Sequence, residues 1–211
     1  MPDRRPILII MVKAPVAGRV KTRLGTDIGM TQAAWWYRHQ TAGLIRRLRD
    51  RRWRIILATA NAAHQPNPKC WPYTVARMNQ GQGDLGQRMK RLLARFSSSP
   101  AVLIGSDIPS IEKHHIACAF RVIAKNQFVF GPSMDGGFWL VGAPRINSLP
   151  STIFENCRWS TEFALNDAER SLSDNRRMRI ATLRDVDDVI DLMKLGFTMT
   201  IKKFHVSETY E

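Results

Sequence analysis

The stretch ILIIMVKAPVAGRVKTRLG, residues 7–25, joins a strongly apolar run to a short basic loop. Residues 7–12 are continuously apolar, which is typical of a strand that is buried on both faces of a parallel sheet. Four cations follow it, together with residues that favour turns: Lys13, Pro15, Gly18, Arg19, Lys21, Arg23 and Gly25. Ligands of open α/β sheets bind beyond the carboxyl ends of the strands, so this loop lies where a ligand is expected.

The chemistry of the loop suits phosphate. Pro15 and Gly18 allow the backbone to turn tightly close to a ligand. Lys21 and Arg23 can balance phosphate charge, and a guanidinium can bind phosphate through two hydrogen bonds. The Walker pattern G-x-x-x-x-G-K-[ST] is absent, so this is not a P-loop. The alternative is a basic surface loop without a ligand.

The rest of the chain alternates between strand and helix patterns, which predicts an α/β fold with a largely parallel sheet. Strands are expected at 7–12, 53–59, 101–105, 127–131, 138–142 and 178–183. Helices are expected at 31–51, 84–96 with Asp84 as its cap, 109–125 opened by Pro109, about 161–172 capped by Ser160 or Thr161, and 188–196. Residues 60–74 are expected to form a loop, and 197–206 a small strand or an ordered tail. No linker or repeat is found, so one domain spanning residues 1–211 is expected.

The composition excludes several classes of protein. Hydrophobic residues make up 44% of the 211 residues, which is enough for a sizeable core. No run of about 18 apolar residues is present, so no membrane span is expected. The three cysteines are far apart and form no C-x-x-C pair, which argues against a disulfide framework or a cysteine zinc site. The N-terminal apolar run is too short for a signal peptide, so a cytoplasmic location is expected.

The formal net charge of +14 is compatible with nucleic acid, an acidic membrane surface or an anionic small substrate. No helix-turn-helix, zinc or aromatic-basic RNA motif is found. We therefore expect a solvated basic surface and no nucleic-acid partner.

Carboxylates follow the strand patterns at three places. Asp107 in GSDIPS (105–110) comes after a buried strand, where a carboxylate can hold a hard divalent ion such as Mg²⁺. The alternative is that Asp107 only caps the helix opened by Pro109. Asp135 in GPSMDGGFWLVG (131–142) precedes two glycines, and a D-G hairpin is the simplest interpretation. Even so, one cleft at the strand ends could hold both aspartates.

The third place is the acidic cluster in LRDVDDVIDLM (183–193), which contains Asp185, Asp187, Asp188 and Asp191. Carboxylates are favoured at a helix N-terminus, which would explain the cluster without a ligand. A bound metal ion would instead relieve the repulsion between them.

Two further features are given no functional role. GQGDLG (81–86) matches the dinucleotide pattern G-x-G-x-x-G, but the preceding VARMNQ is a poor buried strand, so capping by Asp84 is the better explanation. His114 and His115 are adjacent on a predicted helix and point about 100° apart, which makes them poor joint ligands.

Taken in order, the segments KAPVAGRVKTRL, QGQGDLGQRM, GSDIP, GPSMDGGFWLVG and the late DVDD resemble the DUF2064 proteins. These are glycosyltransferase-like members of the nucleotide-diphospho-sugar transferase (GT-A) superfamily, and they are similar to phospholactate and molybdenum-cofactor guanylyltransferases. The resemblance spans about residues 7–195. It implies a Rossmann-like GT-A fold with a mixed, mainly parallel sheet, a nucleotide site at the first loop, and a divalent metal (Mg or Mn) on Asp107.

The sequence departs from the family pattern at two positions. The late motif D-x-D-T-P-x-D-L reads DVDDVIDL here and lacks Thr-Pro, so Asp187 as the second metal ligand is less directly implied. The position of the tyrosine in D-G-G-Y holds Phe138, so a hydroxyl contact from that position is lost.

The expected function is a metal-dependent transferase that uses a nucleotide or sugar nucleotide and an acceptor, most directly a sugar-nucleotide-dependent glycosyltransferase. The alternatives are a nucleotidyltransferase that releases pyrophosphate and a non-catalytic nucleotide- or nucleic-acid-binding protein. The expected phosphate-binding residues are Lys13, Pro15, Gly18, Arg19, Lys21 and Arg23. Asp107 and Asp187 are expected to bind the metal, and Asp135 to be catalytic, with Gly136 and Gly137 on the acceptor side. The base, the sugar, the acceptor and the oligomeric state stay open.

Overall fold

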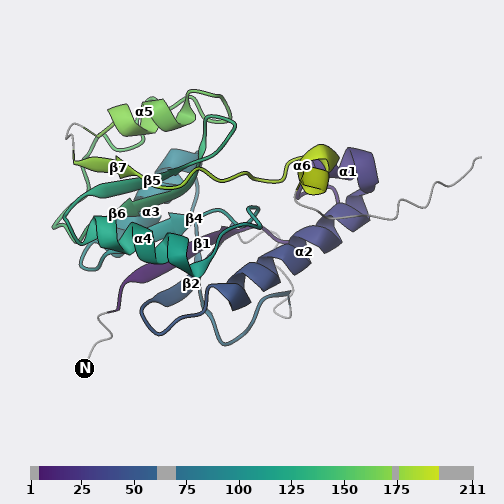
Figure 1. Cartoon of the computed structure of the whole chain (residues 1–211), viewed down its shortest axis with the longest axis horizontal. Helices are drawn as coiled ribbons and strands as arrows, with labels where there is room; N and C mark the ends of the chain where they lie inside the picture. Colours follow the sequence, from purple (N-terminus) through teal and green to yellow (C-terminus); the bar gives the residue numbers. More distant parts are fainter. Residues whose placement is uncertain (1–4, 61–69, 173–175, 195–211) are drawn as a thin grey trace, which may run out of the picture.

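A mainly parallel sheet forms the centre of the molecule (Figure 1). The structure, a computed structural model, describes residues 5–60, 70–172 and 176–194, and in these residues the sheet has seven strands in the order β3-β2-β1-β4-β6-β5-β7. The strands are β1 (Ile7–Val12), β2 (Arg54–Thr59), β3 (Ala76–Asn79), β4 (Ala101–Ile104), β5 (Phe128–Pro132), β6 (Phe138–Ala143) and β7 (Arg177–Arg179). Only β6 among these described strands runs antiparallel, between β4 and β5.

Strand β1 is the buried centre of the parallel part of the sheet. It pairs with β2 on one side and β4 on the other, so that Ile9 lies opposite Ile56 and Leu103. Leu8, Ile9 and Ile10 are all fully buried. The continuous apolar run therefore follows from the covering of both faces, as the sequence predicts.

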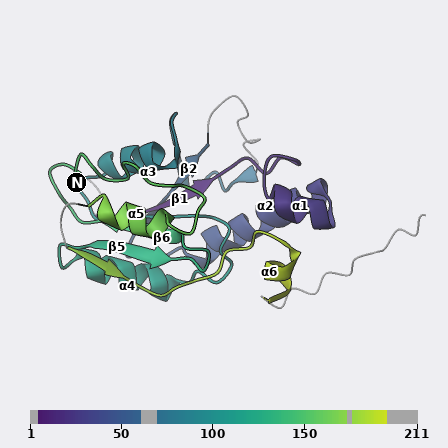
Figure 2. The ribbon, with the colours of Figure 1, turned by 90° about the horizontal axis from the view of Figure 1, so that it is seen from above.

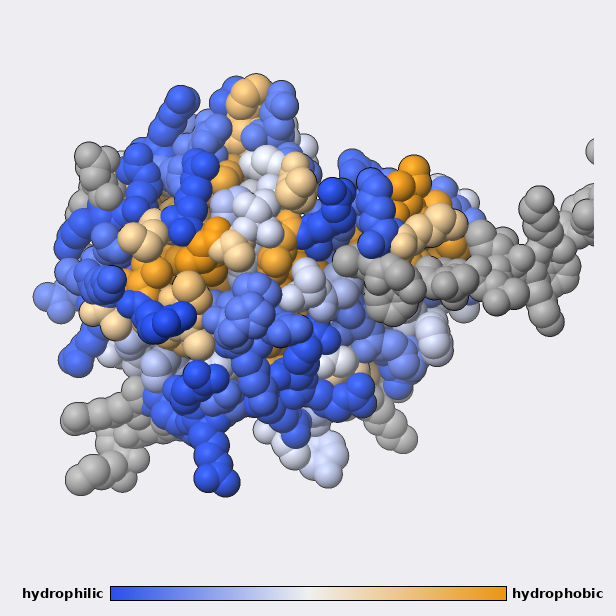
Figure 3. All heavy atoms as spheres, in the orientation of Figure 1, coloured by the Kyte–Doolittle hydropathy of each residue, from blue (hydrophilic) through white to orange (hydrophobic). Residues whose placement is uncertain are grey.

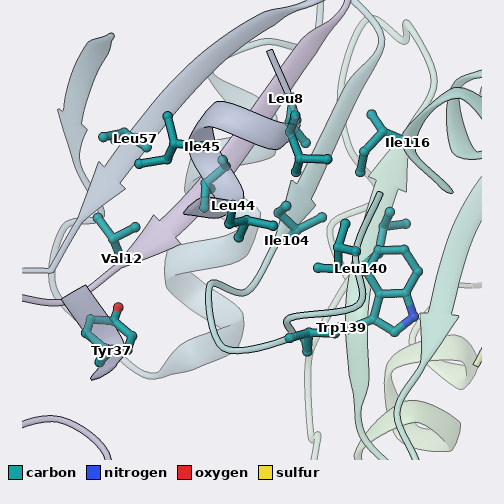
Figure 4. Close-up of a cluster of buried hydrophobic side chains, with 14 of the residues drawn as sticks. Leu8, Val12, Tyr37, Leu44, Ile45, Leu57, Ile104, Ile116, Trp139 and Leu140 are labelled. Atoms are coloured by element: carbon teal, nitrogen blue, oxygen red, sulfur yellow. The ribbon is translucent and has the colours of Figure 1, made fainter. Parts of the chain in front are cut away.

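Two helices cover each face of the sheet (Figure 2). Helices α2 (Met30–Arg47) and α4 (Lys113–Ile123) pack on the face that carries Leu8 and Ile10 (Figure 4). Helices α3 (Leu85–Ala94) and α5 (Ala164–Arg170) pack on the opposite face, which carries Ile7 and Ile9. The expected mixed α/β architecture, a mainly parallel sheet flanked by helices, is confirmed.

Two short helices meet at one end of the molecule. These are α1 (Thr22–Ile28), directly after the basic loop, and α6 (Val189–Lys194), at the end of the described chain. The carboxylate of Asp27 accepts a hydrogen bond from the backbone N–H of Val189 at 3.2 Å, which ties α6 to α1. Segments from the two ends of the chain are thereby brought together beside the first loop.

The predicted helix at 31–51 is present as α2, which begins one residue earlier, at Met30, and ends four residues earlier, at Arg47. Helix α1 was not predicted, because its residues were assigned to the basic loop. Gly29 separates the two helices and adopts a φ of +92°, which favours glycine.

The prediction that Pro109 opens a helix is also wrong. Helix α4 begins at Lys113 with Glu112 at its N-cap, where the N–H of Glu112 donates to His115 Nδ1 at 3.0 Å. Asp107 therefore lies well before the helix and does not cap it. The alternative interpretation of Asp107 as a helix cap is excluded by this geometry.

Other differences concern the edges of elements. Residues 76–79 form the edge strand β3, which pairs with β2 and has mostly exposed side chains, so it lacks the apolar pattern of a buried strand. The cap of α3 is confirmed, because Asp84 and Gln87 form a reciprocal capping box. Helix α5 begins after Phe163 without a side-chain cap, and β7 ends at Arg179. The predictions for 197–206 and for most of the 60–74 loop fall outside the described residues.

The surface is mostly hydrophilic on the face drawn in Figure 3, with apolar residues showing between the charged ones. Within the described ranges, no helix combines the length and the apolar character that crossing a bilayer requires.

Two glycine-to-alanine substitutions should have opposite effects on stability. At Gly142 in β6, an added Cβ would lie 2.6 Å from Val129 Cγ1 and 2.7 Å from Ile123 Cδ1, so Gly142→Ala should destabilise the fold by about 1–3 kcal/mol. At Gly43 in α2, nothing lies within 4 Å of an added Cβ, so Gly43→Ala should stabilise by about 0.5–1 kcal/mol. Urea unfolding of both variants measures the two effects, and a loss of stability in both would contradict the packing described here.

Candidate active site

A cavity of about 600 Å³ opens at the carboxyl ends of the parallel strands. Its walls come from the basic loop, the end of β4, the β5–β6 turn, residues 159–164 and the segment between β7 and α6. The predicted site residues that line it are Lys13, Lys21, Arg23, Asp107, Asp135, Gly137 and Asp187. Pro15, Gly18, Arg19 and Gly136 do not line it. The structure thus brings to one cavity both predicted metal ligands, the predicted catalytic Asp135, and part of the phosphate-binding and acceptor-side sets.

Lys21 joins the two aspartates that the sequence assigns to the metal. Its Nζ lies 2.9 Å from Asp107 Oδ2 and 2.9 Å from Asp187 Oδ1, and only 8% of its side chain is exposed. Burial favours the neutral amine, but the two carboxylates outweigh it and raise the pKa of Lys21 above its ordinary value. Lys21 is therefore a charged ammonium held between two carboxylates.

A hydrogen bond to the hydroxyl of Tyr37 holds the backbone of the basic loop in place. The N–H of Lys13 donates to Tyr37 Oη at 2.9 Å, and this hydroxyl lies 2.9 Å from Ser106 Oγ. Tyr37 comes from α2 and Ser106 from the end of β4, so one buried hydroxyl links three segments. Burial raises the pKa of Tyr37, because it disfavours the charged phenolate.

Lys21 adopts the left-handed conformation, with a φ of +47°, directly before α1. Its buried neighbours Val20 and Leu24 anchor the loop in the core. The conformation directs the chain into the helix while the ammonium stays between the carboxylates. Arg23 behaves differently, because 78% of its side chain is exposed and its Nη1 lies 3.4 Å from Asp187 Oδ2.

The segment that carries Asp187 runs across the strand ends from β7 to α6 (Figure 1). Val186 is fully buried, and its N–H donates to the backbone oxygen of Asp107 at 3.2 Å. This contact holds the two predicted metal ligands side by side although 80 positions separate them. Burial opposes the ionisation of Asp187, but Lys21 and Arg23 outweigh it and lower the pKa of that carboxyl.

Asp185 is a cavity residue that the sequence identified only as part of the acidic cluster. Burial and the neighbouring carboxylates of Asp135, Asp187 and Asp107 raise the pKa of Asp185 to about 6. In the sequence, Asp185 differs from Asp188 and Asp191 in being the first aspartate of DVDD. Asp188 and Asp191 instead bond within their own segment, where Asp188 Oδ1 accepts from the N–H of Asp191 at 2.9 Å.

Asp135 lies in the turn that joins β5 to β6. Its Oδ1 accepts a hydrogen bond from the N–H of Gly137 at 3.0 Å. Gly136 has a φ of +84°, and an added Cβ would lie 2.2 Å from the backbone oxygen of Glu162. The hairpin interpretation is therefore correct, and the same turn forms the cavity wall against residues 159–164.

The wall opposite the basic loop is apolar. Leu85, Leu103, Phe138 and Trp159 line it, and the rings of Phe138 and Trp159 meet edge to face with centroids 6.2 Å apart. Gly86 allows Trp159 to approach α3, because an added Cβ would lie 2.7 Å from the indole ring. The phenylalanine that replaces the family tyrosine is part of this wall. Sequence reasoning missed Trp159, which lies outside the motifs.

Gln80 and Arg88 form a polar corner that the sequence also missed. The buried amide of Gln80 donates to the backbone oxygens of Val12 and Ala58 at 3.3 and 2.8 Å. Its Oε1 accepts from Arg88 Nη1 at 3.1 Å. Gln80 thus connects the ends of β1 and β2 to α3 and places a guanidinium beside the cavity. Both residues belong to QGQGDLGQRM, so the motif contains two cavity residues in addition to the helix cap.

The donor set at Asp107 and Asp187 suits a hard divalent ion. Oxygens from both carboxylates already face one cation, the ammonium of Lys21. Mg²⁺ typically takes one or two carboxylates and fills its other positions with water and substrate phosphate. In the described part of the chain no group of three or more His, Cys, Asp or Glu side chains is close enough to hold a metal. Asp107 and Asp187 would therefore supply two carboxylate ligands to such an ion, and water or substrate oxygens would have to fill its other positions.

Residues 44–161 match DUF2064, whose description is "Uncharacterized protein conserved in bacteria". The match covers more than half of the chain and includes QGQGDLGQRM, GSDIP and GPSMDGGFWLVG. The chain belongs to the DUF2064 family. No match is found among curated proteins.

Solved structures agree on the fold of this DUF2064 protein. A protein from Desulfovibrio desulfuricans G20, provisionally named a nucleotide-diphospho-sugar transferase, shares 27% identity at a TM-score of 0.80, with 97% of this chain and 92% of that chain covered. A CMP:2-keto-3-deoxy-manno-octonic acid synthetase complexed with CTP has a TM-score of 0.53 at 10% identity, with 90% of this chain and 96% of that chain covered. The complex of Rv0371C from Mycobacterium tuberculosis H37Rv with manganese has a TM-score of 0.50 at 16% identity, covering 90% of this chain and 97% of that chain. The fold is the Rossmann-like GT-A fold of nucleotide-diphospho-sugar transferases.

Removing the charge of Asp185 should stabilise the metal-free protein at high pH. A carboxyl whose pKa is raised on folding lowers stability as pH rises from about 4 to about 6, because the folded state resists its ionisation. Asp185→Asn should therefore gain about 1–2 kcal/mol at pH 8, a value reduced by solvent screening of this partly exposed group, and almost nothing at pH 4.

Urea unfolding in the presence of a chelator measures this pH dependence. Asp187→Asn is the matched control with the opposite sign, because the pKa of Asp187 is lowered in the folded state and its carboxylate stabilises the protein at high pH. If Asp185→Asn were less stable than the parent protein at pH 8, the electrostatic description of the cavity would be wrong.

Proposed function

We propose that this protein is a metal-dependent transferase that binds a nucleotide-activated substrate in the cavity, and most directly a sugar-nucleotide-dependent glycosyltransferase. The observation that carries the proposal is the meeting of Asp107, Asp187 and Lys21 at one point beneath the basic loop. A diphosphate in this position would face the cations of the loop on one side and a metal-binding carboxylate pair on the other. The 27% identical relative, provisionally named a nucleotide-diphospho-sugar transferase, supports the same reaction class.

The nucleotide side of the cavity is the side of the basic loop. Lys13 and Arg23 line the cavity there and can contact phosphate oxygens through charge-assisted hydrogen bonds. In glycosyl transfer the nucleoside diphosphate leaves from the anomeric carbon, so negative charge builds on its phosphate. Fixed cations stabilise that charge in the transition state. A divalent ion held by Asp107 and Asp187 would supply further charge stabilisation to the same phosphates.

The acceptor side is the side of the β5–β6 turn. Its cavity-lining residues include Asp135, Ser160 and Thr161, next to the apolar wall of Phe138 and Trp159. Carboxylate and hydroxyl groups suit an acceptor that brings a hydroxyl group better than one that brings a phosphate. This difference favours glycosyl transfer over nucleotidyl transfer, in which an acceptor phosphate would have to approach Asp135.

The reaction products distinguish the candidate activities. Incubation with a panel of sugar nucleotides and nucleoside triphosphates, with Mg²⁺ or Mn²⁺, should release a nucleoside diphosphate from one of the sugar nucleotides. Asp107→Asn is the control and should abolish this release, because it removes one of the two carboxylates. Release of pyrophosphate would instead indicate a nucleotidyltransferase. Binding of DNA or RNA with a steep salt dependence, and of no nucleotide, would contradict both activities.

Asp135→Asn should reduce kcat much more than it changes the KM for the nucleotide. The substitution removes a proton acceptor on the acceptor side, and general base catalysis contributes typically about 10²–10⁴-fold to a rate. An asparagine Oδ1 can still accept the hydrogen bond from Gly137, so the turn and its wall are kept. Steady-state kinetics with the identified donor and acceptor, together with thermal unfolding as a control for the fold, make the measurement. Unchanged kcat would leave Asp135 with only its role in the turn.

A further inference from the structure

The ammonium of Lys21 lies between the carboxylates of Asp107 and Asp187, where a metal ion bound by both would have to enter. Nζ is 2.9 Å from one oxygen of each carboxylate. A divalent ion that took these two oxygens as ligands would displace Nζ, because two cations between the same oxygens would repel each other strongly.

We infer that Lys21 and a divalent ion compete for the Asp107–Asp187 pair, and that Lys21 is a mobile counter-ion which moves onto the substrate phosphates when the metal enters. This inference rests on the metal site of the proposed function. It assigns to Lys21 two alternative partners, the carboxylates before metal binding and the diphosphate after it. Lys21 is then a positioning residue that couples the binding of the metal to the binding of the nucleotide.

The surroundings of Lys21 allow this exchange. The residue lines the cavity as well as contacting both carboxylates, so its ammonium can reach a ligand there without leaving its loop. A lysine side chain has a flexible stem of four carbons, and its ammonium carries three hydrogen-bond donors that can change partners. With most of the side chain buried, however, the ammonium has to find a new anion when it leaves the carboxylates. The phosphates of the nucleotide are anions of this kind, so the metal should bind weakly until they are present.

Arg23 supplies the matched comparison. It carries the same charge on the same loop, and its Nη1 lies 3.4 Å from Asp187 Oδ2, but its side chain is 78% exposed and it forms no salt bridge with Asp107 in the described part of the chain. It therefore contributes to the local potential without occupying the place between the carboxylates. Removing Arg23 and removing Lys21 change the net charge of the protein equally. The two variants differ in whether the lost cation lay between the two carboxylates.

Titration of the metal-free protein with Mn²⁺ alone, followed by electron paramagnetic resonance, tests the competition. Lys21→Met should bind Mn²⁺ more tightly than the parent protein, on the order of 10-fold or more, because the competing charge-assisted bonds are gone. The Mn²⁺ affinity of Arg23→Met should differ from that of the parent by about threefold at most, since this substitution removes a charge that solvent partly screens. Asp107→Asn in the Lys21→Met background should abolish the gain. No nucleotide is present, so this result is independent of which reaction the protein catalyses.

Two results would overturn the inference: Mn²⁺ affinity in Lys21→Met that is no higher than in the parent, or an equal gain in both single variants, which would show a general charge effect. A crystal structure of the parent protein grown with Mn²⁺ gives a second measurement if Lys21→Met does not fold. It should show the ion on Asp107 and Asp187 with Lys21 Nζ moved away from both. An ion on these carboxylates with Lys21 still between them would contradict the competition.

Discussion

The ion triplet of Lys21 with Asp107 and Asp187 is the interaction on which the arrangement of the site depends. Four aspartates line one cavity, and carboxylates at such short range repel one another unless a cation lies among them. Lys21 supplies that cation from the first loop of the chain, while Asp187 comes from its last described segment. The charge balance of the cavity therefore also fixes how the end of the chain crosses the sheet.

The position of this triplet is set by the core beneath it. Strand β1 is covered on both faces and paired on both edges, so the point at which the basic loop leaves the sheet is fixed. Strand β4 lies beside β1 and delivers Asp107 at the same edge. The buried hydroxyl of Tyr37 then holds the loop against the end of β4. Apolar packing thus determines where the charges meet.

Much of this could be predicted from the sequence, because the strongest signals were local. The apolar runs of β1 and β4 are unambiguous, and the loop after β1 is recognisable from its composition, because it combines cations with turn residues. The cap of α3 was predicted for the same reason, since Asp84 directly precedes the helical pattern; the structure adds Gln87 as its reciprocal partner. Family resemblance then supplied the order of the motifs and the fold, which the structural comparisons confirm.

The failures occurred where tertiary contacts override local preference. Pro109 can open a helix, but the chain continues for one more turn before α4 begins, and nothing in the local sequence reports this delay. The partners of Lys21 lie 86 and 166 positions away, and the sequence offered no reason to pair it with protein carboxylates rather than with phosphate. Trp159 likewise joins the cavity through tertiary packing, on Gly86 and against the ring of Phe138.

Because β6 runs antiparallel to its neighbours, the two sides of the cavity come from different kinds of connection. The basic loop and Asp107 follow parallel strands, whereas Asp135 belongs to a hairpin whose turn leans on residues 159–164 through Gly136 and the backbone of Glu162. The hairpin and that segment contact each other rather than the parallel strands that carry the basic loop. Under the proposed function, changes in the hairpin would therefore alter the choice of acceptor while the basic loop and the carboxylates near it kept the choice of donor.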